Sequence, residues 1–260
     1  MNRTFNFMIR NLKELSRDPL TYVFSIGFPV VMLITFNVIN SFSSGHTPMF
    51  ELASLLPAIL MFSYTFVMLN MSLLVSKDKQ TSFLKRLFSS PMQAHEFILG
   101  YALIGLMIGM AQNVISVLTG YVISLVMSVE FISFTSVLLL IVSQLPMLLV
   151  SIFIGILFGI VFNDKSAPGI CSIFISLSGI LGGCWMPLET MGDFATFCRT
   201  LPFYPSVELG RICTHATSAL GTPYTLTITS LLGFIPIGVF LIGSVSLACI
   251  LFKKSMTSDI

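Results

Sequence analysis

The stretch FISFTSVLLLIVSQLPMLLVSIFIGILFGIVFN, residues 131–163, decides the class of this protein because none of its side chains is charged. The hydrocarbon core of a bilayer is about 30 Å thick, and about 20 apolar residues cross it as an α-helix. Lipid offers no partner to an unpaired backbone amide or carbonyl group, so a helix is the expected conformation. The stretch therefore predicts a membrane-spanning helix.

Other parts of the chain have the same character, since 55% of its 260 residues are hydrophobic and 9% are charged. Soluble domains carry about 25% charged residues. Five further uncharged stretches cover residues 19–50, 52–76, 97–129, 166–188 and 212–252. We predict an all-α membrane protein with six transmembrane helices, at approximately 20–40, 52–75, 97–127, 132–162, 167–185 and 225–251.

The Lys and Arg residues set the expected orientation, because cytoplasmic loops are enriched in them. Six spans place both termini on one side, and cytoplasmic termini put all but two of the 13 Lys and Arg residues inside. The two exceptions, Arg199 and Arg211, lie in a segment over 186–223 that we expect to be extracellular. The residues expected inside are Arg3, Arg10, Lys13, Arg17, Lys77, Lys79, Lys85, Arg86, Lys165, Lys253 and Lys254.

The first 19 residues have the pattern of an amphipathic helix. Apolar side chains between Phe5 and Leu15 recur at i, i+3, i+4, i+7 and i+10, and the cations occupy other faces. We expect an interfacial helix within residues 1–19. Asp18-Pro19 should end it, because proline disfavours the helical conformation of the preceding residue. The helix could serve simply as a basic anchor that fixes the orientation.

The largest cytoplasmic segment, over 76–96, contains a second amphipathic pattern. Its apolar stripe over 83–88 is interrupted by Lys85 and Arg86, and Pro91 follows. The pattern predicts a short surface helix that ends before Pro91. This helix could lie on the inner headgroups, or it could be the surface through which a cytoplasmic partner moves the spans.

Several classes of function lack the residues that they need. The five cysteines show no CxxC or Cys/His spacing, and a net charge of +2 does not favour a nucleic-acid partner. The motifs GxxxxGK[ST], HExxH and GxSxG are absent. No predicted span holds an ionisable residue near its middle, as ion-coupled carriers commonly do. We therefore expect no catalytic residue, no metal and no cofactor bound by this chain.

Small and polar residues inside the spans indicate how the helices pack. Asparagine and glutamine side chains should hydrogen-bond between helices, with contact to a transported molecule as the alternative. Cys198 and Cys213 both lie in the outer segment, and the sequence leaves their pairing open. The glycine pairs with GxxxG spacing are Gly105/Gly109, Gly155/Gly159 and Gly179/Gly183, and the amides are Asn37, Asn40, Asn70, Gln112, Asn113 and Gln144.

Three stretches follow one another along the chain in a familiar order. They are IRNLKELSRDPL (9–20) with FP (28–29), then KDKQTSFLKRLFSSP (77–91) with FILG (97–100), then LSG (177–179) with WMP (185–187) and LPFYP (201–205). Together they resemble the permease subunits of bacterial ABC-2 type transporters, a family that includes daunorubicin-resistance and nodulation-export permeases. Ser82 departs from the family, which usually has glycine at that position.

The resemblance implies a homodimer, or a heterodimer with a second permease, that docks on two copies of a cytoplasmic ABC ATPase in the bacterial plasma membrane. ATP and Mg²⁺ would bind to the ATPase. It also implies an elbow helix over 1–19, a six-span domain over 20–260, a coupling helix in the loop after the second span, and a substrate path between the subunits. The expected coupling residues are Lys77, Lys79, Phe83, Leu84, Lys85, Arg86, Leu87 and Phe88, and the expected path residues are Phe36, Asn37, Phe62 and Ser178.

We therefore predict the membrane-spanning subunit of an ATP-binding-cassette exporter whose cargo is a drug, antibiotic, peptide or other amphiphile. A passive channel or a membrane scaffold without an ATPase partner is the alternative. An enzyme acting on lipid would need a buried cluster of polar residues that the sequence does not display. The neighbouring lipid is an expected partner, and nucleic acid is not.

Overall fold

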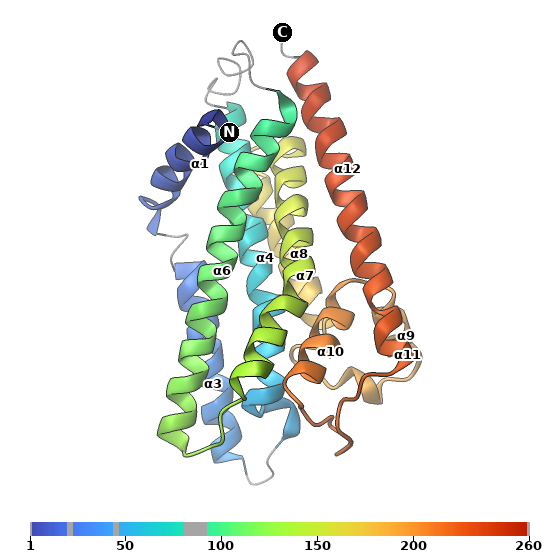
Figure 1. Cartoon of the computed structure of the whole chain (residues 1–260). Helices are drawn as coiled ribbons and strands as arrows, with labels where there is room; N and C mark the ends of the chain where they lie inside the picture. The colour runs from blue at the N-terminus through green and yellow to red at the C-terminus, as the bar shows by residue number, and fades with distance from the viewer. Residues whose placement is uncertain (1, 20–22, 44–46, 81–92, 259–260) are drawn as a thin grey trace.

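The computed structural model describes residues 2–19, 23–43, 47–80 and 93–258. Within them, five helical segments are long and apolar enough to cross a membrane: Val23–Phe42, Leu52–Gln80, Ala94–Met127, Phe134–Val161 and Ile228–Ser255. The long helices run side by side in one bundle (Figure 1). These segments correspond to five of the six predicted spans, so the all-α membrane class is confirmed.

The remaining predicted span, over 167–185, is a shorter helix in the structure. Helix α8 (Ala167–Leu181) has 15 residues, which at 1.5 Å per residue cover about 22 Å of a hydrocarbon core about 30 Å thick. It ends at Leu181, Gly182 caps it, and Gly183 has a φ of +64°, a left-handed conformation that favours glycine. The chain therefore leaves the helix four residues before the predicted boundary.

Helix α4 (Leu52–Gln80) is the centre of the bundle, since most of its residues are buried. It packs most extensively against α7 (Phe134–Val161). A Cβ atom added at Gly155 of α7 would collide with the backbone oxygen of Met68, and one added at Gly159 would lie 2.8 Å from the backbone oxygen of Ser72. This GxxxG pair therefore brings two helix backbones of the same chain into contact.

Buried amide side chains link the helices, as the sequence predicts. Tyr64 of α4 donates to Asn113 of α6 (Ala94–Met127) at 2.7 Å. Gln144 of α7 donates to the backbone oxygen of Ser206 at 2.7 Å and accepts from the Ser206 hydroxyl at 2.8 Å. Gln112 of α6 donates to the backbone oxygen of Ser25 at 2.7 Å. Interhelical hydrogen bonding is therefore confirmed for Asn113, Gln144 and Gln112, and also for Asn70, which donates to the Ser25 hydroxyl. The prediction is wrong for Asn37, which donates to Leu33 within its own helix, and for Asn40, which accepts from the Thr47 backbone amide.

The bundle has two different ends (Figure 1). Helix α1 (Asn2–Leu15) and the end of α12 (Phe234–Ser258) lie at one, which we name the α1 end. The other, the α10 end, carries α9 (Asp193–Arg199), α10 (Phe203–Cys213) and α11 (Ile228–Leu232). The short helices η2 (Pro48–Phe50) and η3 (Leu188–Thr190) and the π-helical turn η1 (Val23–Gly27), which precedes α3 (Phe28–Phe42), complete the order.

The segment over 186–223 packs onto the bundle at the α10 end. Nine consecutive residues of α10, from Phe203 to Arg211, are buried. The apolar character of this segment therefore reflects burial against other helices. Cys198 is buried and Cys213 is partly buried, and both are free thiols. The structure thus favours the unpaired alternative for these two cysteines.

Candidate functional site

The last turns of α4 hold a buried carboxylate that joins three helices. Asp78 is 1% exposed. The Arg10 guanidinium of α1 donates to one carboxylate oxygen of Asp78 at 3.1 Å, and the Tyr101 hydroxyl of α6 donates to the other at 2.7 Å. A buried carboxylate needs such partners because its desolvation is costly. We name Arg10, Glu14, Lys77, Asp78 and Tyr101 the polar clamp.

Glu14 forms a second layer of the polar clamp. Its carboxylate lies 3.1 Å from Arg10, one helical turn earlier on α1, and 2.8 Å from the Lys77 ammonium group. Beside the clamp, the Lys79 ammonium group donates to the backbone oxygen of Ile160 near the end of α7 at 2.7 Å. Side-chain contacts thus tie α1, α6 and α7 to the end of α4.

Most of the apolar face of α1 packs on protein, although Phe5 is exposed. Phe7 contacts Phe97 and Tyr101 of α6 edge to face, with ring centroids 5.4 and 5.0 Å apart. A Cβ atom at Gly100 would lie 2.6 Å from the Phe7 ring, so glycine permits this close approach. The helix predicted within residues 1–19 is present over Asn2–Leu15, and it covers α6 with its apolar face. It ends before Asp18-Pro19, the predicted stop.

Two of the predicted coupling residues, Lys77 and Lys79, lie at this end of α4. The other six, Phe83, Leu84, Lys85, Arg86, Leu87 and Phe88, lie outside the described residues. After this segment, the backbone amide of Gln93 donates to the Glu96 carboxylate at 2.9 Å and so caps α6. The predicted coupling segment is therefore bounded by the polar clamp on one side and by a capped helix on the other.

Aromatic rings form a continuous column between α3 and α4. The indole of Trp185 stacks on Phe36 of α3 with centroids 5.0 Å apart, and it meets Phe62 of α4 edge to face at 5.1 Å. Phe36 also stacks on Phe50 at 5.1 Å, and Phe62 lies 5.5 Å from Phe28. We name these five rings the aromatic column.

The aromatic column contains two of the four predicted path residues, Phe36 and Phe62. Ser178 is buried, and its hydroxyl donates to the backbone oxygen of Ile175 within α8. Asn37 donates to the backbone oxygen of Leu33 and lines an open cavity of about 660 Å³ at the α10 end. The structure thus gathers Phe36 and Phe62 around Trp185, which is not among the predicted path residues, and places Asn37 beside a cavity.

The α10 end contains a buried cation, Arg211, which is 1% exposed. Its guanidinium donates to the backbone oxygens of Ser54 and Gly183 at 3.3 and 3.2 Å and to the Tyr224 hydroxyl at 3.2 Å. The Glu189 carboxylate lies 3.6 Å away, which is an ion pair without a hydrogen bond. Burial lowers the pKa of Arg211, and the nearby carboxylate of Glu189 opposes that shift.

A second ion pair lies close by on the same segment. Arg199 is 3.2 Å from Glu208, and the guanidinium side chain is half-exposed whereas the carboxylate is nearly buried. Burial raises the pKa of Glu208, and Arg199 partly offsets this effect. Both cations of the segment over 186–223 thus face carboxylates, so this end of the molecule carries little net positive charge.

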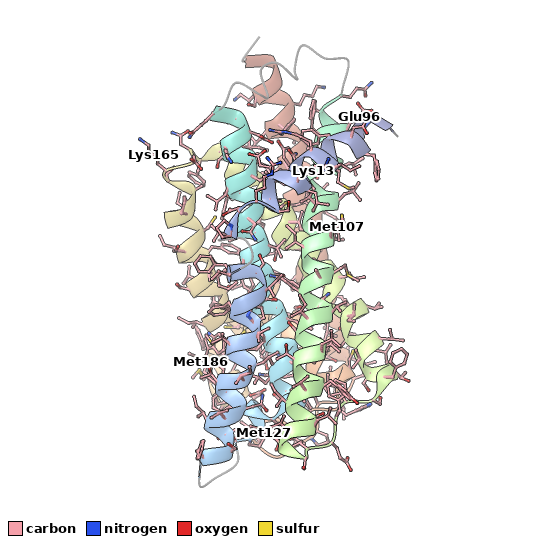
Figure 2. The ribbon with its side chains drawn as sticks, turned by 90° about the vertical axis from the view of Figure 1, so that its left-hand side faces the viewer. Lys13, Glu96, Met107, Met127, Lys165 and Met186 are labelled. Carbon is pink, nitrogen blue, oxygen red and sulfur yellow. The ribbon has the colours of Figure 1, made fainter. Side chains whose placement is uncertain are left out.

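Figure 2 shows Lys13 and Lys165 at the α1 end and Met127 and Met186 toward the α10 end. Among the described residues, no group of His, Cys, Asp and Glu side chains could hold a metal ion.

The sequence profile of the ABC-2 type transporter family matches residues 3–215. The chain belongs to the ABC-2 type transporter family. No curated protein gives a significant match.

In this ABC-2 transporter subunit, the matched range contains the polar clamp, the aromatic column and Arg211, and the whole of α12 lies beyond it. Membership of this family identifies the chain as a multi-pass membrane protein that is a component of a transporter. Sequence reasoning missed Asp78 because Lys77 and Lys79 flank it and suggest a solvated turn. The signal that could have revealed Arg211 is its place in a run over 203–213 that is apolar apart from Ser206, Glu208 and Arg211 itself.

Proposed function

We propose that this chain is the membrane-spanning subunit of an exporter, coupled to a separate cytoplasmic ABC ATPase through the segment that follows α4. The observation that carries the proposal is the polar clamp, in which Asp78 bonds both Arg10 and Tyr101 two residues before α4 ends. A force applied to the segment after Gln80 would act on α4, and through the clamp on α1 and α6. The chemistry of ATP and Mg²⁺ takes place on the partner chain.

The distribution of cations supports cytoplasmic termini in a bacterial plasma membrane. Lys13, Lys77 and Lys165 lie at the α1 end, whereas Arg199 and Arg211 on the opposite side face carboxylates. Cytoplasmic segments are enriched in Lys and Arg, so the α1 end is the cytoplasmic one in this proposal. The segment over 186–223 then lies at the outer face. In this proposal, α8 and the residues up to Trp185 together form the remaining membrane crossing, which brings the total to six.

The proposed substrate path runs between this subunit and a second permease, which is either another copy or a sister chain. The aromatic column supports a path along α3, because Phe36 and Trp185 are partly exposed and their stacked rings form an apolar surface. Aromatic faces suit drugs, antibiotics and other amphiphiles, which bury apolar area against them. Movement would follow from a two-state change in which the ATPase pair contacts one arrangement of the helices better than the other.

A charge reversal in the predicted coupling segment tests this function. The double variant Lys85→Glu/Arg86→Glu should insert into the membrane as the wild type does, but it should lose co-purification with the ATPase. The matched control is Lys253→Glu/Lys254→Glu, which reverses the other pair of adjacent cations predicted on the same side. Unchanged recovery of the ATPase and unchanged transport in the first variant would refute coupling through this segment and favour the channel or scaffold alternative.

A further inference from the structure

Helix α1 separates two adjoining hollows of opposite chemistry at the α1 end. A polar groove of about 890 Å³ is lined by four cations, Arg10, Lys13, Arg17 and Lys77, and by two carboxylates, Glu14 and Asp18. An apolar slot of about 230 Å³ lies between α1, η1 and α6, and its walls include Leu12, Ser16, Ile26, Met107 and Ala111. Helix α1 thus contributes residues to the walls of both the groove and the slot.

Two of the four cations that line the groove belong to the polar clamp, and the other two do not. Arg10 and Lys77 both engage Glu14. Lys13 and Arg17 are exposed, and their side chains make no ion pair or hydrogen bond within the described part of the chain. Lys13 lies in the last turn of α1 and Arg17 in the turn that follows the helix, and both side chains line the same groove. The groove therefore offers two adjacent cations to a negatively charged group.

The slot begins beside these cations. Leu12 and Ser16, which line the slot, directly precede Lys13 and Arg17, which line the groove, so the two hollows adjoin at the end of α1 and the turn after it. Figure 2 shows Lys13 on α1 and Met107 on α6 further along the bundle, toward the opposite end. Met107 is 46% exposed, so the slot opens on the apolar outer surface of α6. A molecule that fills both hollows needs an anionic head and an apolar tail.

We propose that the groove and the slot together bind an anionic phospholipid, with its phosphate beside Lys13 and Arg17 and an acyl chain against Met107 and Ala111. Charge complementarity favours an anionic headgroup, because each cation near a membrane surface contributes about 1 kcal/mol toward anionic lipid. The apolar slot favours a lipid over a soluble anion, since a soluble anion leaves it unfilled. The bound lipid would hold α1 against α6 and requires no ATPase.

Native mass spectrometry of the purified chain in detergent, titrated with phosphatidylglycerol or phosphatidylcholine, tests this site. The wild type should bind one phosphatidylglycerol about 30-fold more tightly than phosphatidylcholine, which corresponds to about 2 kcal/mol from two cations. Lys13→Gln/Arg17→Gln should abolish the preference, and the charge-preserving variant Lys13→Arg/Arg17→Lys should keep it. Lys165→Gln, a cation at the same end outside the groove, should leave it unchanged.

The slot is tested by filling it. Ala111→Phe should weaken the binding of both lipids at least tenfold without changing their ratio, whereas Leu118→Phe, at an exposed position further along α6, should change neither. Glycerol phosphate in excess should not displace the lipid. Equal affinity of the wild type for the two lipids, an unchanged preference in Lys13→Gln/Arg17→Gln, or displacement by glycerol phosphate would overturn the proposal. None of these measurements depends on transport or on ATP hydrolysis.

Discussion

Replacing Arg211 with methionine should destabilise the α10 end strongly, because this cation joins three separate segments. Its guanidinium donates to Ser54 at the start of α4, to Gly183 after α8 and to Tyr224. The variant Arg211→Met removes all of these bonds and leaves two backbone oxygens without their donor. It also leaves the Glu189 carboxylate, whose side chain is 14% exposed, without its cation.

The size of the effect follows from burial. Removing one partner of a buried ion pair costs about 3–5 kcal/mol, because the other charge stays desolvated and uncompensated. The double variant Glu189→Met/Arg211→Met removes that stranded charge, so it should be about 1–2 kcal/mol more stable than Arg211→Met. Arg199→Met is the matched control, since Arg199 is half-exposed and its pair with Glu208 should contribute about 1 kcal/mol or less.

Unfolding by SDS in mixed micelles measures these free energies, and the single tryptophan of the chain, Trp185, reports on the site. It lies two residues from Gly183, which accepts a hydrogen bond from Arg211. An unfolding free energy of Arg211→Met within about 1 kcal/mol of the wild type would refute the role of this cation. A double variant that is no more stable than Arg211→Met would refute the assignment of the cost to Glu189.

Three further predictions concern other parts of the bundle. Gly155→Ala should lower the unfolding free energy by about 1–3 kcal/mol, because the added methyl group would collide with the Met68 backbone oxygen, and an unchanged value would contradict direct backbone contact between α4 and α7. Asp78→Asn should weaken the attachment of α1 through Arg10, so hydrogen exchange of the α1 amides should become faster, and equal exchange in both proteins would count against the clamp. Burial raises the pKa of Glu208 above its usual 4.5, so its contribution to stability is present below that pH and is lost as the pH rises through the raised value. Glu208→Gln should therefore flatten the fall of unfolding free energy above about pH 4.5, and a slope equal to that of the wild type would disprove this.

The spans could be predicted from the sequence because the bilayer imposes a simple rule on them. An uncharged stretch of about 20 residues is sufficient to indicate a membrane helix, and five of the six predicted spans appear as such. The stretch over 167–185 satisfies the same rule, yet its helix stops at Leu181. The hydrophobicity of the stretch does not reveal the left-handed turn at Gly183, because that turn depends on backbone geometry.

The site was less predictable, since its residues meet through long-range packing. The family resemblance predicts Phe36 and Phe62 as path residues, but the ring that joins them, Trp185, lies more than 120 positions from Phe62 along the chain. Asp78 resembles a solvated residue in the sequence, and its burial depends on Tyr101 from another helix. Periodicity within a helix identifies an apolar face, but it does not identify the partner of that face.

Purification of the chain from its native membrane in mild detergent, with identification of the proteins that accompany it and an assay of ATP hydrolysis, tests the central claim most directly. An exporter subunit should be recovered with a roughly equimolar partner that carries the GxxxxGK[ST] motif and hydrolyses ATP in a vanadate-sensitive manner. Repeated recovery of the chain without any ATPase would contradict the proposed coupling and favour a passive channel or a membrane scaffold.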